Sequence, residues 1–198
     1  MTFEKFHRVA VAASALALLL DGCTTPMAGF TRNLCVAGAV PVSSRWDDQL
    51  HRVFDRLARI AGADVAWDDV VIVAVDGPPT LSTAWTCGGM RRSTIAFTVR
   101  ALARLNTFRA ADELVAVTIA HELAHVALHI RSSGKNTDVE EIEADTLGVY
   151  YFERAGYDCR RWVTGEGYVV PEDRREAADV ACADAKRGLR PSLRRSSP

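Results

Sequence analysis

Hydrophobic positions along the chain recur with two different periods, which together predict helices and short strands. Apolar residues three or four positions apart indicate helices, whereas β-branched runs or strict alternation indicate strands. On this basis we expect helices over about residues 44–61, 100–105, 112–130, 137–155 and 171–186, and strands over 70–75, 85–86 and 94–99. A few strands among longer helices favour an α+β fold with a small antiparallel or mixed sheet.

Residues that typically cap helices stand near several of these boundaries. Ser43 or Ser44 can begin the first helix and Asp112 the third, because a short polar side chain can accept a bond from a free backbone N–H. Thr137 and Glu140 have the spacing of a capping box at the start of the fourth helix, and Gly156 is placed to end that helix.

The N-terminus predicts an exported, lipid-anchored protein. Lys5 and Arg8 precede an apolar run from Val9 to Leu20, which is too short to span a membrane and is typical of a signal peptide. The segment Leu20-Asp21-Gly22-Cys23 resembles a bacterial lipobox, although Asp21 departs from the small neutral residue usually found there. The alternatives are a buried helix, or ordinary secretion with Cys23 incidental.

These features divide the chain into four parts. Residues 1–22 are the predicted signal peptide, 23–42 the lipidated Cys23 and a flexible tether, 43–188 the folded domain, and 189–198 a disordered tail. The expected location is therefore the cell envelope, on the periplasmic face of a membrane, which is the outer membrane in a Gram-negative source.

Composition is that of a single folded domain. The chain has 198 residues, of which 48% are hydrophobic and 25% charged, and its formal net charge is -1. Because Lys and Arg are scattered, no basic surface favours nucleic acid as a partner. The sequence leaves the oligomeric state open.

Four cysteines remain beyond Cys23, and an even number in an exported chain suggests two disulfides. They are Cys35, Cys87, Cys159 and Cys182. Three pairings are possible, of which we favour Cys35 with Cys87 and Cys159 with Cys182, because each would link neighbouring segments. The alternative is buried free thiols.

The segment His121-Glu122-Leu123-Ala124-His125 carries the clearest chemical signal. Within a helix, residues four apart lie on one face, so His121 and His125 can share one metal ion. Glu122 lies on the flank of that face, where it can act as a general base on water, as in H-E-x-x-H proteases. The alternative is a surface helix with two histidines and a solvated glutamate.

A catalytic zinc needs a third protein ligand, and the acidic segment 140–145 offers candidates on the next helix. Glu141 and Asp145 lie one turn apart on one face. Glu140 is explained by the capping box, and Glu143 faces elsewhere. We therefore predict that Glu141 completes the metal site.

The same face also carries Asp145, Ala144 and Gly148. The two small residues predict that this helix packs closely on the helix of His121. Asp145 is placed to accept a hydrogen bond from the second ring nitrogen of a ligand histidine, which would fix the orientation of that ring.

Other candidate residues receive no role. His129 lies on the same stripe as His121 but about 12 Å away along the helix axis, too far to share its metal. A metzincin would need a third histidine at position 131, where Arg131 stands. Tyr168, Tyr157 and His51 are conceivable oxyanion donors, and we leave that role unassigned.

These motifs resemble the M48 family of gluzincin peptidases, which pair a helical H-E-x-x-H with a later E-x-x-x-D. The matching residues are His121, Glu122, His125, Glu141 and Asp145. Further similarity runs from about Trp85 to Asp158, and includes Asp112-Glu113-Leu114, Glu143-Ala144-Asp145, Gly148 and Ala155-Gly156-Tyr157-Asp158. The spacing between the motifs is short, and the family's transmembrane helices are not evident.

The resemblance implies a zincin-like metalloendopeptidase with one zinc ion per chain that acts on protein or peptide substrates. It also suggests that Thr94 to Thr98, whose alternation predicts a half-exposed strand, is the edge strand on which an extended peptide aligns. One alternative is a noncatalytic, zinc-stabilised envelope lipoprotein with a chaperone or binding role. Another is a small intracellular metallopeptidase that regulates transcription.

Overall fold

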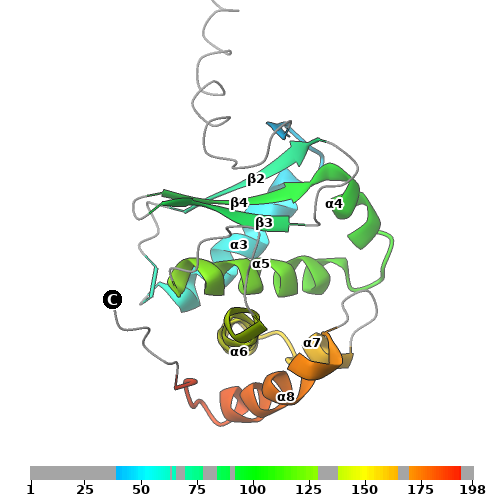
Figure 1. The fold of residues 1–198 in the computed structure, drawn as a ribbon. Coiled ribbons are helices and arrows are strands. Elements are labelled where there is room, and N and C mark those ends of the chain that lie inside the picture. Colours follow the sequence, from blue (N-terminus) through cyan, green and yellow to red (C-terminus); the bar gives the residue numbers. More distant parts are fainter. Residues whose placement is uncertain are drawn as a thin grey trace, which may run out of the picture.

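The computed structural model describes residues 39–62, 64–65, 70–77, 84–89, 92–128, 138–164 and 170–192 (Figure 1). Within these ranges the strands are β1 (Val40–Pro41), β2 (Val70–Asp76), β3 (Ala84–Gly89) and β4 (Arg92–Thr98). The helices are α3 (Asp47–Ala61), α4 (Val99–Leu105), α5 (Ala111–Ala127), α6 (Asp138–Arg154), α7 (Arg160–Thr164) and α8 (Glu172–Lys186).

The strands form a mixed sheet in the order β1-β2-β4-β3. β2 pairs parallel with β4, whereas β1 with β2 and β3 with β4 pair antiparallel. Figure 1 shows this sheet lying over α5, with α6 and then α8 farther from it. The predicted α+β class, with a small mixed sheet packed on the helix of the H-E-x-x-H motif, is confirmed.

The prediction that residues 94–98 form the edge strand is wrong. β4 is bonded on both sides, to β2 and to β3, and its residues from Thr94 to Thr98 are all buried. The alternation misled because threonine and alanine are small enough for a covered face as well as a solvated one. The outer position beside β4 belongs to β3.

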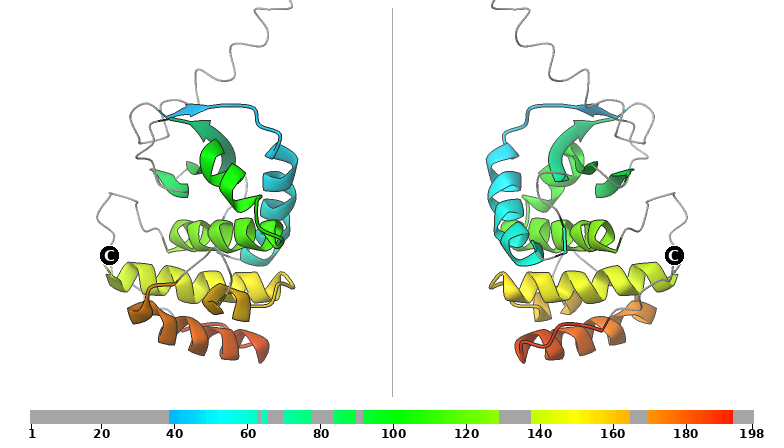
Figure 2. Two further views of the ribbon diagram at one scale, coloured as in Figure 1. Left: turned by 90° about the vertical axis from the view of Figure 1, so that its right-hand side faces the viewer. Right: turned by 90° about the vertical axis from the view of Figure 1, so that its left-hand side faces the viewer.

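Helix α5 is the central element of the fold. Its buried residues occur around the whole helix, as expected of a helix covered on several sides. Viewed from the side in Figure 2, α5 lies between the sheet and α6, and α8 covers the far side of α6. A single hydrophobic cluster runs through these layers and includes Ile95, Leu123, Leu147 and Trp162.

The contact between α5 and α6 is unusually close at one glycine. A Cβ atom placed on Gly148 would lie 2.6 Å from Cη2 of Trp162 and 3.1 Å from the carbonyl oxygen of Ala120. No side chain fits there without moving the buried Trp162 ring or α5 itself. The predicted close packing of the two helices is thus confirmed at Gly148.

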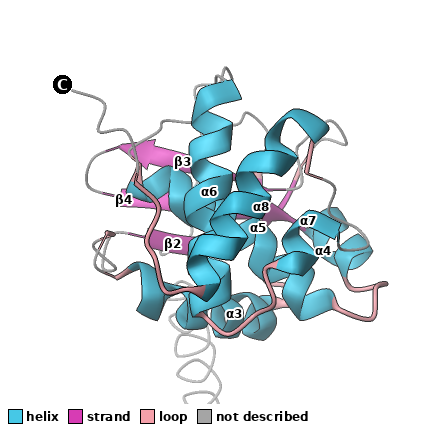
Figure 3. Cartoon of the chain, turned by 90° about the horizontal axis from the view of Figure 1, so that it is seen from below, coloured by secondary structure: helices cyan, strands magenta, loops and turns pink. Residues whose placement is uncertain are grey.

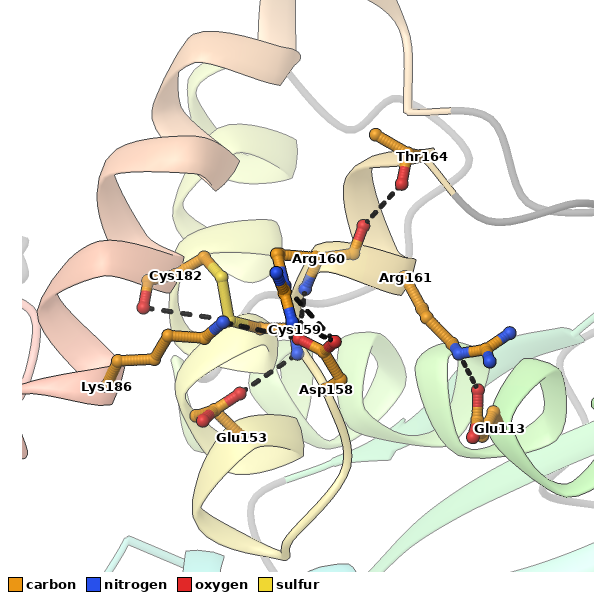
Figure 4. Close-up of polar contacts among 9 residues, drawn as sticks. All are labelled: Glu113, Glu153, Asp158, Cys159, Arg160, Arg161, Thr164, Cys182 and Lys186. Carbon is orange, nitrogen blue, oxygen red and sulfur yellow. Dashed lines mark hydrogen bonds and ion pairs between the residues drawn. A yellow bond between two sulfur atoms is a disulfide. The ribbon is translucent and has the colours of Figure 1, made fainter.

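A disulfide between Cys159 and Cys182 fastens α8 to the chain that follows α6 (Figure 4). Its Cα atoms are 5.5 Å apart. Around it, the backbone N–H of Cys159 donates to Glu153, and Lys186 pairs with Asp158 at 3.3 Å. The favoured pairing of these two cysteines is confirmed, while the pairing of Cys35 with Cys87 lies outside the residues and side chains that the structure describes.

Helix boundaries differ from the predictions mainly at their N-termini. Asp112 does not cap α5; it lies in the first turn and pairs with Arg52 at 3.0 Å. Ser44 lies before the cap of α3 and bonds to Asp47. Gly156 ends α6 as predicted, with a φ of 83°.

The predicted signal peptide, Cys23, and most of the tether lie outside the described residues. Val40 and Pro41, near the end of the predicted tether, pair with β2, and Arg190 of the predicted tail forms an ion pair with Asp64. In the part of the chain that the structure describes, no helix is both long and apolar enough to cross a membrane. The division into four parts otherwise stays a prediction.

Replacing Gly148 by alanine should destabilise the protein by about 1 to 3 kcal/mol, because the added methyl group overpacks the α5–α6 contact. Thermal or urea unfolding of the metal-free protein measures this loss. The control is Gly62→Ala, since Gly62 is exposed and its φ of -60° suits alanine. Equal stability of the two variants would contradict the close contact.

Candidate metal centre

Two helices bring three potential metal ligands together. His121 and His125 lie one turn apart on α5, and Glu141 lies in the first turns of α6. The Nε2 atoms of the two imidazoles are 3.0 Å apart. Oε2 of Glu141 is 3.3 Å from Nε2 of His121, and Oε1 is 3.4 Å from Nε2 of His125.

These separations fit one tetrahedral ion. Zinc bonds of about 2.0 to 2.1 Å to nitrogen and oxygen place neighbouring ligands about 3.3 Å apart in tetrahedral geometry. The observed separations are close to this value: 3.0 Å between the imidazole nitrogens, and 3.3 and 3.4 Å from each nitrogen to a different oxygen of Glu141. Three protein ligands leave the fourth tetrahedral position for water or substrate, which distinguishes a catalytic zinc site from a closed structural one.

Asp145 orients the ring of His121. One turn along α6 from Glu141, its Oδ1 lies 2.9 Å from Nδ1 of His121, and the carboxylate is fully buried. Because a carboxylate accepts, Nδ1 carries the proton in this contact and the lone pair of Nε2 faces His125 and Glu141. This is the tautomer that a metal ligand requires, and Asp145 takes the position predicted for it.

Arg174 of α8 completes the cluster and was not predicted. Its guanidinium lies 2.7 Å from Oε2 of Glu141 and 2.8 Å from Oδ2 of Asp145. The sequence holds one signal for it. One face of α8 carries small buried residues, and Arg174 lies on the same face one turn before the first of them. These residues are Ala178, Ala181, Cys182 and Ala185. A charged residue at the end of such a stripe indicates a buried ion pair.

The charges of the cluster favour a cation. Glu122, Glu141 and Asp145 are three carboxylates, and Arg174 compensates one of them, so two negative charges remain for a divalent ion to balance. Burial lowers the pKa of His121, but hydrogen bonds to Asp145 and Glu141 and the charge of Glu122 outweigh it and raise this pKa to about 9. A proton on His121 and a metal ion are therefore two ways of balancing the negative charge of the same carboxylates.

The predicted base, Glu122, is buried beside this cluster and has its own partner. The hydroxyl of Thr86 on β3 lies 2.6 Å from Oε2 of Glu122 and 3.1 Å from the backbone oxygen of the same residue. The sequence predicted that Thr86 lies in a strand but assigned it no functional role. A threonine in a strand gives no sequence signal of what lies opposite it.

Two of the three conceivable oxyanion donors, His51 and Tyr157, are described, and neither joins the cluster. His51 is exposed on α3, where Nδ1 contacts the backbone oxygen of Asp47. Tyr157 follows the far end of α6, about 20 Å from Glu141 along the helix axis, and stacks on Phe152. Tyr168 lies outside the described residues, so the oxyanion role stays unassigned. His129, which is too far along the helix to share the metal, lies outside them as well.

A second group of potential ligands, Glu153, Asp158 and Cys159, does not form a metal site. The sulfur of Cys159 is bonded to Cys182, and Asp158 is paired with Arg160 and Lys186 (Figure 4). These contacts hold the pKa of Asp158 well below its usual range. The group stabilises the junction of α6, α7 and α8.

Comparison with known families gives one result. Residues 44–133 match the model of peptidase family M48. The match contains His121, Glu122 and His125 and ends before Glu141, so the position of the third ligand rests on the geometry described above. A comparison with curated proteins found no match.

Arg174→Met should destabilise the metal-free protein by about 3 kcal/mol or more, because it leaves two largely buried carboxylates without their cation. The loss should be smaller in the zinc-loaded protein, since the ion compensates part of the same charge. Unfolding with and without a chelator measures both values. The control is Arg175→Met at the neighbouring exposed position; a loss of equal size there would contradict the ion-pair assignment.

Proposed function

We propose that the chain, whose residues 44–133 match the model of peptidase family M48, is a zinc-dependent endopeptidase of the bacterial cell envelope. His121, His125 and Glu141 are the proposed zinc ligands, and Glu122 is the proposed general base. Asp145 and Arg174 hold the ligands in place. The substrates are proteins or peptides.

One observation carries this proposal. The two imidazole nitrogens lie 3.0 Å apart, each is 3.3 or 3.4 Å from a different oxygen of Glu141, and a buried glutamate stands directly beside His121 in the chain. A site that only stabilised the fold would need a fourth protein ligand and no base. Among the described residues, only His121, His125 and Glu141 supply ligands at this centre.

The side chains divide the reaction between them. Zinc, when bound, supplies Lewis-acid polarisation of the scissile carbonyl and lowers the pKa of water. Glu122 accepts the proton that the attacking water loses and then delivers it to the nitrogen of the leaving amine as the C–N bond breaks. The Asp145 carboxylate keeps Nδ1 of His121 protonated, so that the lone pair of Nε2 would be available to the metal.

Substrate binding is proposed at β3. Among the described strands, β3 pairs with β4 alone, and we propose that its other edge pairs with an extended peptide. Thr86 of β3 contacts Glu122, which means that a peptide on this strand would run beside the base. We therefore propose that β3, and not residues 94–98 of the neighbouring β4, is the strand on which the peptide aligns.

The proposed location rests on the N-terminal sequence and on the disulfide. Lys5, Arg8 and the apolar run to Leu20 are typical of an export signal, and Cys23 follows at the position of lipidation. The disulfide between Cys159 and Cys182 supports an oxidising compartment over the cytosol. It therefore favours an envelope enzyme over an intracellular regulator.

Glu122→Gln should keep one zinc per chain and lose about 10² to 10⁴-fold in peptide hydrolysis, because the amide has the shape of the carboxylate but cannot take a proton. Metal analysis and cleavage of a peptide substrate, each with and without a chelator, measure the two properties.

Glu143→Gln provides the matched control for this experiment, since it makes the same change on the neighbouring helix outside the cluster. Full hydrolysis by the zinc-loaded Glu122→Gln protein would refute the role of Glu122. If that variant instead rescued a deletion strain as well as wild type does, the noncatalytic binding role would be supported.

Cys23→Ala should release the full-length protein from the membrane fraction, because the acyl chains that would anchor it are attached to this sulfur. Fractionation of cells that express each form, followed by immunoblotting, measures the change. The control is Thr24→Ala, which leaves the cysteine in place. A wild-type protein found entirely in the soluble fraction would overturn the lipid anchor.

A further inference from the structure

The base of the proposed reaction is held by a residue of the sheet. Thr86 lies in β3, opposite Ile95 of β4, and its side chain reaches α5. Its Oγ1 lies 2.6 Å from Oε2 of Glu122 and 3.1 Å from the backbone oxygen of Glu122. Thr86 is 5% exposed and Glu122 is 8% exposed, so the contact is largely shielded from water.

The single hydroxyl proton goes to the carboxylate. Hydrogen bonds from a hydroxyl to a carboxylate are typically about 2.5 to 2.7 Å long, and the 2.6 Å contact falls within this range. The longer contact, to a neutral carbonyl oxygen, is the weaker of the two. One carboxylate oxygen of Glu122 is thereby engaged by Thr86, and Oε1 remains for the reacting water.

The strand makes this donor rigid. Ile95, the partner of Thr86 in β4, is fully buried, which fixes the backbone on which Thr86 stands. A β-branched side chain in a strand has few allowed χ1 values. The donor is therefore presented to Glu122 in one place, in contrast to a long side chain that would have to be ordered first.

We propose that Thr86 is a positioning residue, whose hydroxyl holds Glu122 in the orientation from which it takes the proton of the attacking water. Because Thr86 belongs to the edge strand, it also links the orientation of the base to the strand on which we propose that substrate binds. This inference rests on the proposed peptidase function. Thr86 itself touches neither the reacting atoms nor the metal ligands.

Kinetics of two variants test the hydroxyl. Thr86→Val preserves the shape of the side chain and should lower kcat by about 10 to 100-fold, since small displacements of catalytic groups have effects of this size. Its KM and its zinc content should stay within about threefold of wild type. Thr86→Ser, which keeps the hydroxyl, should recover most of the lost kcat.

Thr94→Val controls for the loss of a buried hydroxyl from the sheet. Thr94 is also 5% exposed, and it lies in β4 next to Ile95, so its side chain projects from the opposite face of the sheet. Its kcat should match that of wild type. A Thr86→Val enzyme with the kcat of Thr94→Val would overturn the proposal.

Unfolding of the metal-free protein provides a test that needs no activity. The comparison uses wild type, Thr86→Val, Glu122→Ala and the double variant. Thr86→Val should lower Tm at least about twice as much when Glu122 is present as when it is alanine, because only then is a buried carboxylate left without its donor. Equal shifts in the two backgrounds would overturn the contact.

The two experiments also separate this inference from the proposed function. If wild type binds zinc but cleaves no peptide, the peptidase assignment fails and the catalytic role of Thr86 fails with it, while unequal Tm shifts would still support the hydrogen bond. If wild type cleaves peptide and Thr86→Val does so equally well, the proposed function stands and Thr86 has no positioning role.

Discussion

The distance between α5 and α6 determines the geometry of the candidate metal centre. Two ligands stand on one helix and the third on the other, so the three atoms reach tetrahedral separations only if the helix axes approach closely. Gly148 permits that approach, because the carbonyl oxygen of Ala120 and the ring of Trp162 occupy the space that a side chain would fill. The fully buried Trp162 ring then stacks edge-on against Phe152 and holds the contact. Packing two turns away from Glu141 thus controls how far its carboxylate lies from the two imidazoles.

The second constraint is electrostatic. A site with three buried or half-buried carboxylates is costly without positive charge, and the fold supplies Arg174 from α8 to reduce that cost. Seen from below in Figure 3, α8 lies across α6, the helix that carries Glu141 and Asp145. The disulfide between Cys159 and Cys182 then ties α8 to the chain following α6. The C-terminal helix therefore belongs to the site, although it supplies no ligand.

The sequence predicted those parts of the site that follow from the period of a single helix. His121 and His125 share a face because they are four residues apart, and Glu141 and Asp145 do so for the same reason. To predict that the two pairs lie next to each other, one must also assume that the two helices pack closely. The small residue Gly148 indicated this close packing.

The contacts between elements that are far apart in the sequence could not be predicted from helical periodicity. Arg174 and Thr86 reach the cluster from α8 and from β3, and nothing in local periodicity says which strand or helix ends beside another. The edge strand was misassigned for the same reason, since strand order is a property of the whole sheet. Asp112 has the residue type of a cap but pairs with Arg52 of α3, a partner 60 positions earlier in the chain.

The proposed metal ligands and the proposed base are supported by different parts of the fold. The ligands are held by packing between α5 and α6 and by charges from α6 and α8. The base stands on α5 as well, but its carboxylate is oriented from the opposite side, by a hydroxyl of the sheet. A change in β3 can therefore move the base while the ligands stay in place, whereas a change in α8 acts on the ligands first. Because β3 is also the strand on which we propose that an extended peptide binds, the fold would let substrate binding affect the proposed base without displacing the proposed ligands.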